Sequence, residues 1–142
     1  MAKRILIADD HESVLRRVRG TLEAHADWEI CGEAADGREA IAKTTELKPD
    51  LVILDFAMPR LDGLQAASEI RKLLPEVPIV MFTMHGSGLN QEAKKHGISR
   101  LVDKGQSGAL VAAVEELLRS HKEGSDAVPK PDEPPAAIRK AV

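Results

Sequence analysis

The sequence predicts an α/β fold, a doubly wound parallel sheet with helices on both of its faces. Five short apolar runs alternate along the chain with five segments in which apolar residues recur at helical spacing. The run Leu51–Leu54 is apolar at every position, which is typical of a parallel strand buried on both faces. Because crossovers in such sheets are right-handed, we expect a flavodoxin-like (βα)5 sheet with the strand order 2-1-3-4-5.

The first half of the chain supplies two strands and two helices before the apolar run. Arg4–Asp10 has the apolar character of a strand, and apolar residues at helical spacing follow it over 14–22. Glu29–Ala35 is a weaker strand. The segment Asp36–Glu39 resembles a capping box, which predicts the start of a helix that Pro49 closes.

The second half repeats the alternation and adds a polar helix. A proline follows the third helical stripe, and Gly97 is placed to stop the polar helix. After the apolar run, the expected elements in order are a helix over 64–74, a strand over Pro78–Met84, a polar helix over Leu89–His96, a strand over Arg100–Lys104 and a helix that Ser107 can cap.

The composition limits the class of protein. With 142 residues, of which 43% are hydrophobic and 30% charged, the chain suits one globular domain. A net charge of −3 with both signs interspersed argues against a nucleic-acid-binding surface. The single cysteine, Cys31, excludes an internal disulfide, and the N-terminal apolar run is too short for a signal peptide or a membrane span. We therefore expect a cytoplasmic protein that makes no contact with a membrane.

The character of the chain changes near Glu123. Residues 123–142 hold four of the eight prolines and no aromatic residue. A segment of this composition cannot bury a core. We expect a folded domain over 1–122 and a disordered Pro-rich tail over 123–142.

Polar side chains stand where the predicted strands end. Asp9 and Asp10 end the first strand, Asp55 follows the third, Thr83 lies near the end of the fourth, and Lys104 ends the fifth. In a doubly wound sheet these ends meet at one edge. Carboxylates about 4 Å apart repel by about 4 kcal/mol at an effective dielectric constant of about 20, so the cluster needs a cation.

The donor types favour Mg²⁺ at this edge. The three acids offer only oxygen, which a hard ion prefers, and we expect no histidine or cysteine in register with them. His11, His25, His96 and His121 are scattered without metal-binding spacing. A lysine and a threonine hydroxyl beside Mg²⁺ suit a phosphoryl group, so Asp55 is the natural nucleophile. Taken singly, the acidic pair could only cap a helix, Lys104 could be a solvated charge, and Thr83 a plain strand residue. The convergence of four strand ends favours the site.

Four motifs together resemble one known family. The stretches "ILIADDH", "DLVILDFAMPRLDG", "PIVMFTM" and "LVDKG" occur in this order within residues 4 to 120. In this respect the chain is similar to the bacterial two-component response regulator receiver domain. The "DDH" start and the Lys-Gly ending resemble the subgroup whose receivers precede a C-terminal helix-turn-helix.

The resemblance implies phosphorelay signal transduction in which Asp55 accepts a phosphoryl group from a histidine kinase or a phosphotransfer protein. Lys104 would pair with the phosphoryl oxygens, and Thr83 would move toward them. Met58, Pro59, Asp62 and Gly63 would be structural. The resemblance further implies that Mg²⁺ is held by the carboxylates of Asp9, Asp10 and Asp55 and by the backbone carbonyl of Ala57.

The sequence departs from the family pattern at the switch position. Three residues before Lys104, where the family usually has an aromatic residue, stands Leu101, which leaves the usual threonine-to-aromatic coupling open. Ala57 and His85 would flank the phosphoryl group. His85 could orient water there or could simply be a loop histidine, with the loop interpretation favoured.

Two other functions compete with a signalling switch. A Mg²⁺-dependent aspartyl-phosphate phosphatase of the haloacid-dehalogenase type needs an acid two residues after its nucleophile, and Ala57 stands there. A flavin carrier on the same fold is disfavoured because only 2% of the residues are aromatic. We expect a phosphoacceptor switch, not an enzyme, with at most self-phosphorylation and self-dephosphorylation chemistry.

The expected partners follow from the resemblance. No helix-turn-helix follows residue 122, so we expect a stand-alone regulator that does not bind DNA directly. A downstream protein would bind through about Leu89–Lys122, the face that the family uses. The protein is expected to be a monomer or a phosphorylation-dependent dimer.

Overall fold

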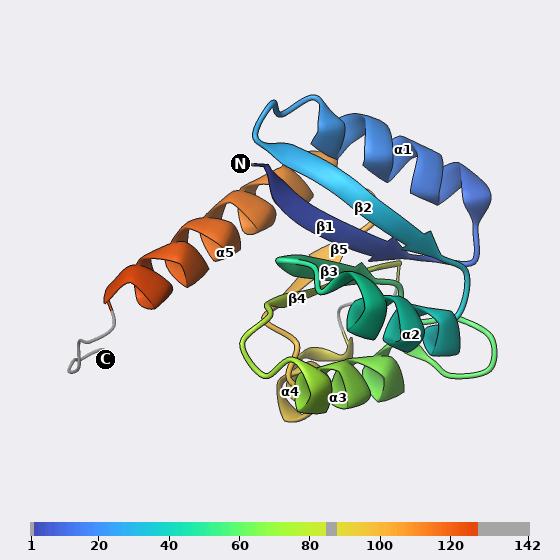
Figure 1. Cartoon of the computed structure of the whole chain (residues 1–142). Helices are drawn as coiled ribbons and strands as arrows, with labels where there is room; N and C mark the ends of the chain where they lie inside the picture. Colours follow the sequence, from blue (N-terminus) through green and yellow to red (C-terminus); the bar gives the residue numbers. More distant parts are fainter. Residues whose placement is uncertain (1, 85–87, 128–142) are drawn as a thin grey trace.

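The structure is a computed structural model that describes residues 2–84 and 88–127 (Figure 1). Strands and helices alternate along the chain, as the sequence predicts. The strands are β1 (Lys3–Ala8), β2 (Trp28–Ala34), β3 (Leu51–Leu54), β4 (Ile79–Thr83) and β5 (Arg100–Asp103). The helices are α1 (Glu12–Glu23), α2 (Gly37–Leu47), α3 (Gly63–Leu73), α4 (Asn90–Lys95) and α5 (Ser107–Ala127).

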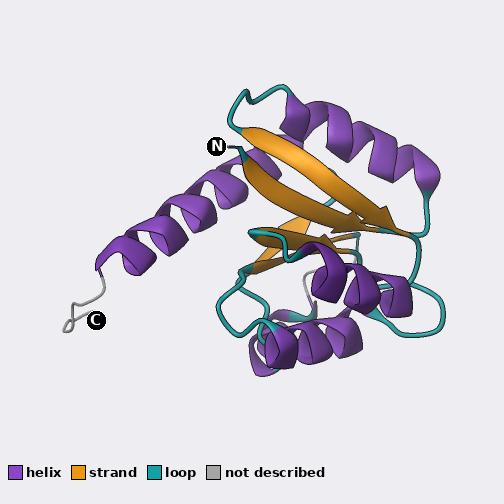
Figure 2. Cartoon of the chain, in the orientation of Figure 1, coloured by secondary structure: helices purple, strands orange, loops and turns teal. Residues whose placement is uncertain are grey.

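The strands form one parallel sheet in the order β2-β1-β3-β4-β5, which confirms the predicted flavodoxin-like topology. Figure 2 shows the sheet between two layers of helices. Helices α1 and α5 contact each other on one side of the sheet, and α2 and α3 contact each other on the other side, where α4 also lies.

The two layers follow from the period of two along each strand. Leu6, Val52 and Met81 point into the core cluster beneath α2, α3 and α4. Ile5 and Phe82 point into the opposite cluster beneath α1 and α5. Because both faces are covered, the central strands are buried at every position, which explains the uninterrupted apolar run in the sequence.

Side-chain caps fix the start of two helices. Asp36 caps α2 by accepting a hydrogen bond from the Glu39 backbone nitrogen at 2.8 Å. The predicted capping box is shifted by one residue, because the Glu39 carboxylate accepts from the backbone nitrogen of Ala35 and not from that of Asp36. A complete capping box starts α3, with Asp62 and Gln65 as its two partners.

The observed boundaries differ from the expected ones where functional residues lie. β1 ends at Ala8 and β5 at Asp103, so Asp9, Asp10 and Lys104 stand just beyond their strands. Helix α5 continues to Ala127 and so passes the domain boundary expected at residue 122. Figure 1 shows its last turns extending beyond the edge of the sheet. Residues 128–142, which make up most of the expected tail, lie outside the described residues.

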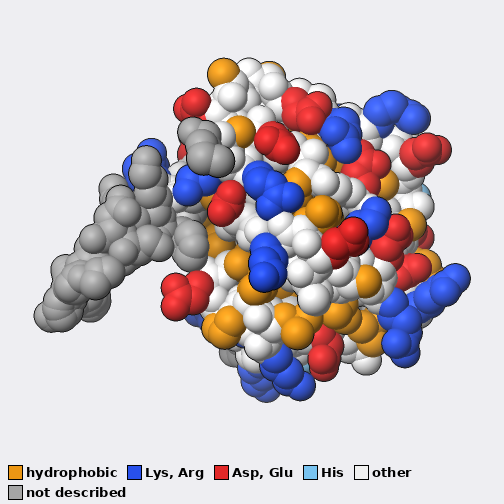
Figure 3. All heavy atoms as spheres, viewed as in Figure 1, with side chains coloured by type: hydrophobic (Ala, Val, Ile, Leu, Met, Phe, Trp, Pro, Cys, Tyr) orange, Lys and Arg blue, Asp and Glu red, His pale blue; other side chains and the backbone are white. Residues whose placement is uncertain are grey.

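The surface carries charges of both signs. On the face drawn in Figure 3, Lys and Arg side chains are interspersed with Asp and Glu side chains, and no single sign covers the face. Within the described part of the chain, no helix combines the length and the apolar character needed to cross a bilayer.

Candidate functional site

The backbone brings four strand ends to one edge of the sheet. The nitrogen of Asp9 donates to the carbonyl of Ala34 at 2.9 Å, and the nitrogen of Asp55 donates to the carbonyl of Ala8 at 2.9 Å. The nitrogen of Lys104 donates to the carbonyl of Thr83 at 3.1 Å. These bonds continue the strand ladders by one residue, so the backbone of the residues that follow β1, β3 and β5 is fixed by the sheet.

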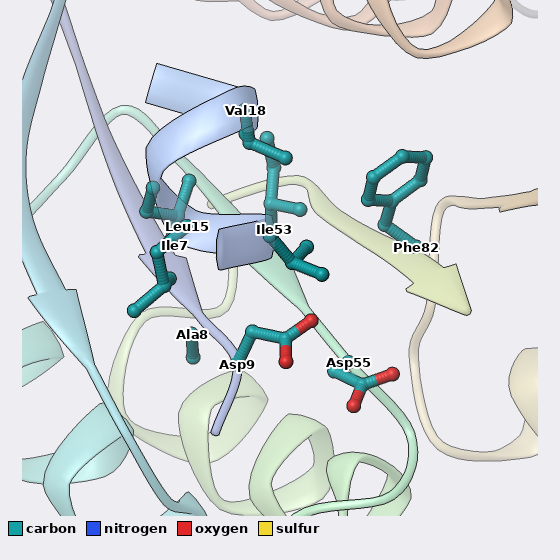
Figure 4. Close-up of a pocket in the computed structure, with 9 residues that line it drawn as sticks. Ile7, Ala8, Asp9, Leu15, Val18, Ile53, Asp55 and Phe82 are labelled. Atoms are coloured by element: carbon teal, nitrogen blue, oxygen red, sulfur yellow. The ribbon is translucent and has the colours of Figure 1, made fainter. Parts of the chain in front are cut away.

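Two buried carboxylates share one ammonium group at this edge. The Lys104 Nζ lies 2.7 Å from Asp9 Oδ2 and 3.2 Å from Asp55 Oδ1. Asp9 and Asp55 are each 4% exposed and Lys104 is 7% exposed, so all three charges are largely removed from water. Figure 4 shows the two carboxylates next to each other at the ends of β1 and β3, below the apolar side chains of Ile7 and Ile53. The cluster therefore has more negative than positive charge.

Burial and the excess of negative charge together raise the pKa of Asp55 above its ordinary value. Burial is the main cause, repulsion from Asp9 is the second, and the attraction of Lys104 only partly offsets them. Burial also opposes the charge on Lys104, but its hydrogen bond to Asp9 and the charges of Asp55 and Asp9 raise the pKa of the ammonium above its ordinary value. The site thus favours the charged form of Lys104 and disfavours the charged form of Asp55. A further cation would offset the excess of negative charge.

The donor set fits a divalent ion. One ligand atom from each of Asp9, Asp10, His11 and Asp55 lies within 4.8 Å of the other three. Asp10 is exposed while Asp9 and Asp55 are buried, so the group opens to solvent on the Asp10 side. Three carboxylates with one compensating ammonium are a suitable oxygen set for a hard cation.

His11 is the residue that sequence reasoning missed. Its Nδ1 lies 3.0 Å from Asp9 Oδ1 and 3.1 Å from Asp10 Oδ1, so the expectation that no histidine is in register with the acids is wrong. His11 is the N-cap residue of α1, and its backbone nitrogen donates to Asp9 Oδ1 at 2.9 Å. The adjacency in "DDH" was the available signal, but a ring at the start of a helix can face either solvent or the strand end.

The structure places three of the four remaining expected site residues. Thr83 is 1% exposed at the end of β4. Ala57 is exposed in the loop two residues after Asp55. Leu101 is half-buried in β5 and packs on the core cluster beneath α2, α3 and α4. His85 lies outside the described residues.

The loop that follows Asp55 folds back onto it. The nitrogen of Gly63 donates to the carbonyl of Phe56 at 2.8 Å. A Cβ on Gly63 would overlap the backbone carbonyl of Asp55, so only glycine fits there. The predicted structural role of the Asp62–Gly63 pair is confirmed, with Asp62 as the helix cap and Gly63 as the point of close approach.

The comparisons with known proteins agree with this arrangement. Residues 5–115 match the response regulator receiver domain family. Response regulator protein VraR of Staphylococcus epidermidis is 45% identical over 83 residues, which cover 58% of this chain and 40% of that protein. The match therefore spans less than half the length of this curated relative.

Solved structures extend the likeness to the whole sheet. A LuxR-family two-component response regulator from Aurantimonas sp. SI85-9A1 superimposes with a TM-score of 0.80 at 34% identity, over 84% of this chain and 87% of that one. The response regulator domain of Thermotoga maritima CheB gives a TM-score of 0.78 at 24% identity, over 84% of this chain and 98% of that one, which shows the shared fold. Because the family match covers most of the chain and the LuxR-family structure shares both fold and sequence, the chain belongs to the response regulator receiver domain family of two-component phosphorelay signalling.

Proposed function

We propose that Asp55 is the phosphoacceptor of this receiver domain. The observation that carries the proposal is the shared ion pair, in which Lys104 holds Asp55 Oδ1 at 3.2 Å and Asp9 Oδ2 at 2.7 Å at the carboxyl edge of the sheet. Lys104 engages one oxygen of Asp55, so Oδ2 is the oxygen assigned to attack. A carboxylate placed in this way is a nucleophile beside a fixed cation.

The transfer conserves atoms and charge with an ordinary phosphodonor. Asp55 Oδ2 forms a bond to phosphorus while the bond from phosphorus to the donor imidazole nitrogen, or to the leaving oxygen of acetyl phosphate, breaks. The leaving group keeps the electron pair. Lys104 then lies within reach of the new phosphoryl oxygens, because it already contacts the acceptor carboxylate.

Mg²⁺ is the cofactor that we assign to the site, held by Asp9, Asp10, Asp55 and the Ala57 backbone carbonyl. When bound, it supplies positive charge that favours ionised Asp55 and neutralises phosphoryl oxygens. Without it, the raised pKa of Asp55 works against ionisation of the nucleophile. The reaction is one transfer per domain, and self-dephosphorylation is a second transfer in which water bonds to phosphorus, the bond from phosphorus to the Asp55 oxygen breaks, and inorganic phosphate leaves. The phosphatase alternative gains no support, because Ala57 offers no acid.

The output is a change in protein contacts. Receiver domains of response regulators interact with histidine kinases and output domains, and the donor here would be a histidine kinase or a phosphotransfer protein in the cytoplasm. Thr83 and Leu101 would carry the change from the site to a partner face over about residues 89–122. We take residues 1–122 as the switching unit and 123–142 as a Pro-rich tail, with a monomer or a phosphorylation-dependent dimer as the assembly.

The test is phosphorylation by acetyl phosphate, followed by intact mass spectrometry. The wild-type chain with Mg²⁺ is expected to gain one phosphoryl group, and Asp55→Asn none. Asp27→Asn makes the same carboxylate-to-amide change at an exposed residue beside the amino end of β1, opposite the acidic group. This control should be phosphorylated like the wild type. A stoichiometric phosphoryl group on Asp55→Asn would overturn the proposal.

A further inference from the structure

The imidazole of His11 lies against two acids of the site, Asp9 and Asp10. Its Nδ1 faces an oxygen of Asp9 at 3.0 Å and an oxygen of Asp10 at 3.1 Å. Asp9 Oδ1 already accepts from the His11 backbone nitrogen, and Asp9 Oδ2 already binds Lys104. The ring makes no side-chain cap for α1. Its position therefore calls for an explanation other than helix capping.

The distances match neighbouring ligands around one metal ion. Donor atoms about 2.1 Å from an octahedral ion stand about 3.0 Å apart when they are adjacent, since their separation is the bond length multiplied by the square root of two. The Nδ1 atom of His11 lies at that spacing from one oxygen of each acid. The four-residue group within 4.8 Å adds an oxygen of Asp55 to the same set.

We propose that His11 Nδ1 is a further ligand of the divalent ion and makes the site bind borderline transition-metal ions, such as Co²⁺, more tightly than Mg²⁺. The inference rests on the proposed function, because it concerns the same metal site. An imidazole nitrogen suits Co²⁺, Ni²⁺ or Zn²⁺, whereas Mg²⁺ gains little from it. When Nδ1 binds the ion, the ring carries its proton on Nε2. The His11 side chain is 62% exposed, so the Nε2–H group can remain in contact with water.

The competing explanation is a simple hydrogen bond from the His11 ring to the acids. A neutral ring that donates from Nδ1 has the same distances but must leave, or turn over, before any ion binds. Removing such a ring would raise the affinity for every divalent ion. Removing a ligand would instead lower the affinity for transition-metal ions and leave Mg²⁺ nearly unaffected. The two roles therefore predict opposite results.

The experiment measures Co²⁺ and Mg²⁺ binding to the full chain by isothermal titration calorimetry. His11→Ala and His11→Asn are expected to lower the ratio of Co²⁺ to Mg²⁺ affinity by about tenfold or more, with Mg²⁺ affinity changed less than about threefold. His11→Asn supplies an amide oxygen without the ring nitrogen, so it separates the loss of nitrogen from the loss of bulk. His25→Ala removes a histidine that stacks on Trp28 away from the site and should leave the ratio unchanged.

Two results would overturn the inference while leaving the proposed function intact. One is an unchanged ratio in both His11 variants, and the other is a uniform rise of affinity for both ions. Failure of the proposed function would look different, because the wild-type chain would then bind neither Co²⁺ nor Mg²⁺, which would show that the metal site does not exist. Thermal unfolding of each variant without metal checks that a lower ratio of Co²⁺ to Mg²⁺ affinity does not result from unfolding of the variant.

Discussion

Burial of the Asp55 carboxylate lowers the stability of the folded protein, whereas the proposed phosphotransfer needs this carboxylate in its ionised form. Its raised pKa means that the native state binds a proton more tightly than the unfolded chain does, chiefly because the carboxylate is buried and lies beside Asp9. Stability therefore falls as the pH rises from the ordinary value of 3.8 through the higher native value. The loss of stability is complete above the native pKa, where the carboxylate is charged in both the native and the unfolded state.

Asp55→Asn is expected to stabilise the metal-free protein at pH 7 by about 1 kcal/mol, because the amide removes a buried charge and leaves Lys104 paired with Asp9. The measurement is urea unfolding with a chelator present. The gain should shrink as the pH is lowered toward the ordinary pKa of aspartate, and Asp27→Asn should show no gain. A variant that is less stable than the wild type at pH 7 would show that the ion pair with Lys104 outweighs the burial of the charge.

At the scale of single elements, the apolar pattern predicts the strands and the order of the sheet. The strand Leu51–Leu54 can be predicted from its sequence alone, because a strand buried on both faces has no polar position. The side-chain details needed the structure. The His11 ring depends on the backbone that joins β1 to α1, and the fit of Gly63 depends on a carbonyl that the loop brings back from Asp55. Neither interaction has a periodic pattern that could predict it.

Helix α4 is tied to α3 at its C-terminal end. The Arg71 guanidinium donates to the carbonyl of Gly97 at 2.6 Å and to the carbonyl of Pro75 at 2.5 Å. Ser68 Oγ lies 2.6 Å from His96 Nδ1. Gly97 has a φ of +84°, and a Cβ there would meet the Arg71 side chain. The contacts of Arg71 with Gly97 and of Ser68 with His96 tie the C-terminal end of α4 to α3.

Arg71→Met should release this end while retaining the aliphatic part of the side chain. We expect a loss of about 1 to 3 kcal/mol of unfolding free energy, because two charge-assisted hydrogen bonds to carbonyls are lost. Amide hydrogen exchange should become faster at Ile98 and the neighbouring residues. Lys72→Met on the same helix removes only an exposed pair with Glu69 and serves as the control. Equal exchange in the two variants would show that Arg71 does not anchor α4.

Leu101 is expected to set how strongly α4 responds to the site. Moving a two-state switch from 1:99 to 99:1 takes about 5.5 kcal/mol of differential stabilisation. A leucine packed on the cluster beneath α4 has no polar tip and less area to rebury than an aromatic ring. The isolated domain is thus expected to respond modestly, with partner binding supplying the remaining bias.

Hydrogen exchange with and without a beryllofluoride mimic of the phosphoryl group measures this response. The changes should be small and confined to the segment between β4 and α4 and to α4 itself. Leu101→Tyr restores the family's usual residue type and should enlarge them. Large cooperative changes across β5 and α5 in the wild-type chain would contradict the assigned role of Leu101.

At the scale of the whole molecule, the site and the core are built from residues before the Pro-rich segment. Four of the eight prolines lie in 123–142, and we expect a segment of such composition not to bury a core. Removing residues 128–142, which leaves α5 complete at Ala127, should change the melting temperature by less than about 2 °C and leave the phosphorylation rate unchanged. A larger fall in melting temperature would show that this segment packs on the domain.

The central claim is that one carboxylate, Asp55, receives the phosphoryl group. Borohydride reduces an acyl phosphate to an alcohol and converts a phosphorylated aspartate into homoserine, so tandem mass spectrometry of the digested protein locates the acceptor. After treatment with acetyl phosphate and Mg²⁺, homoserine is expected at position 55 and at no other aspartate. Homoserine at Asp9 or Asp10, or its absence from position 55 in a chain that has gained a phosphoryl group, would contradict the account.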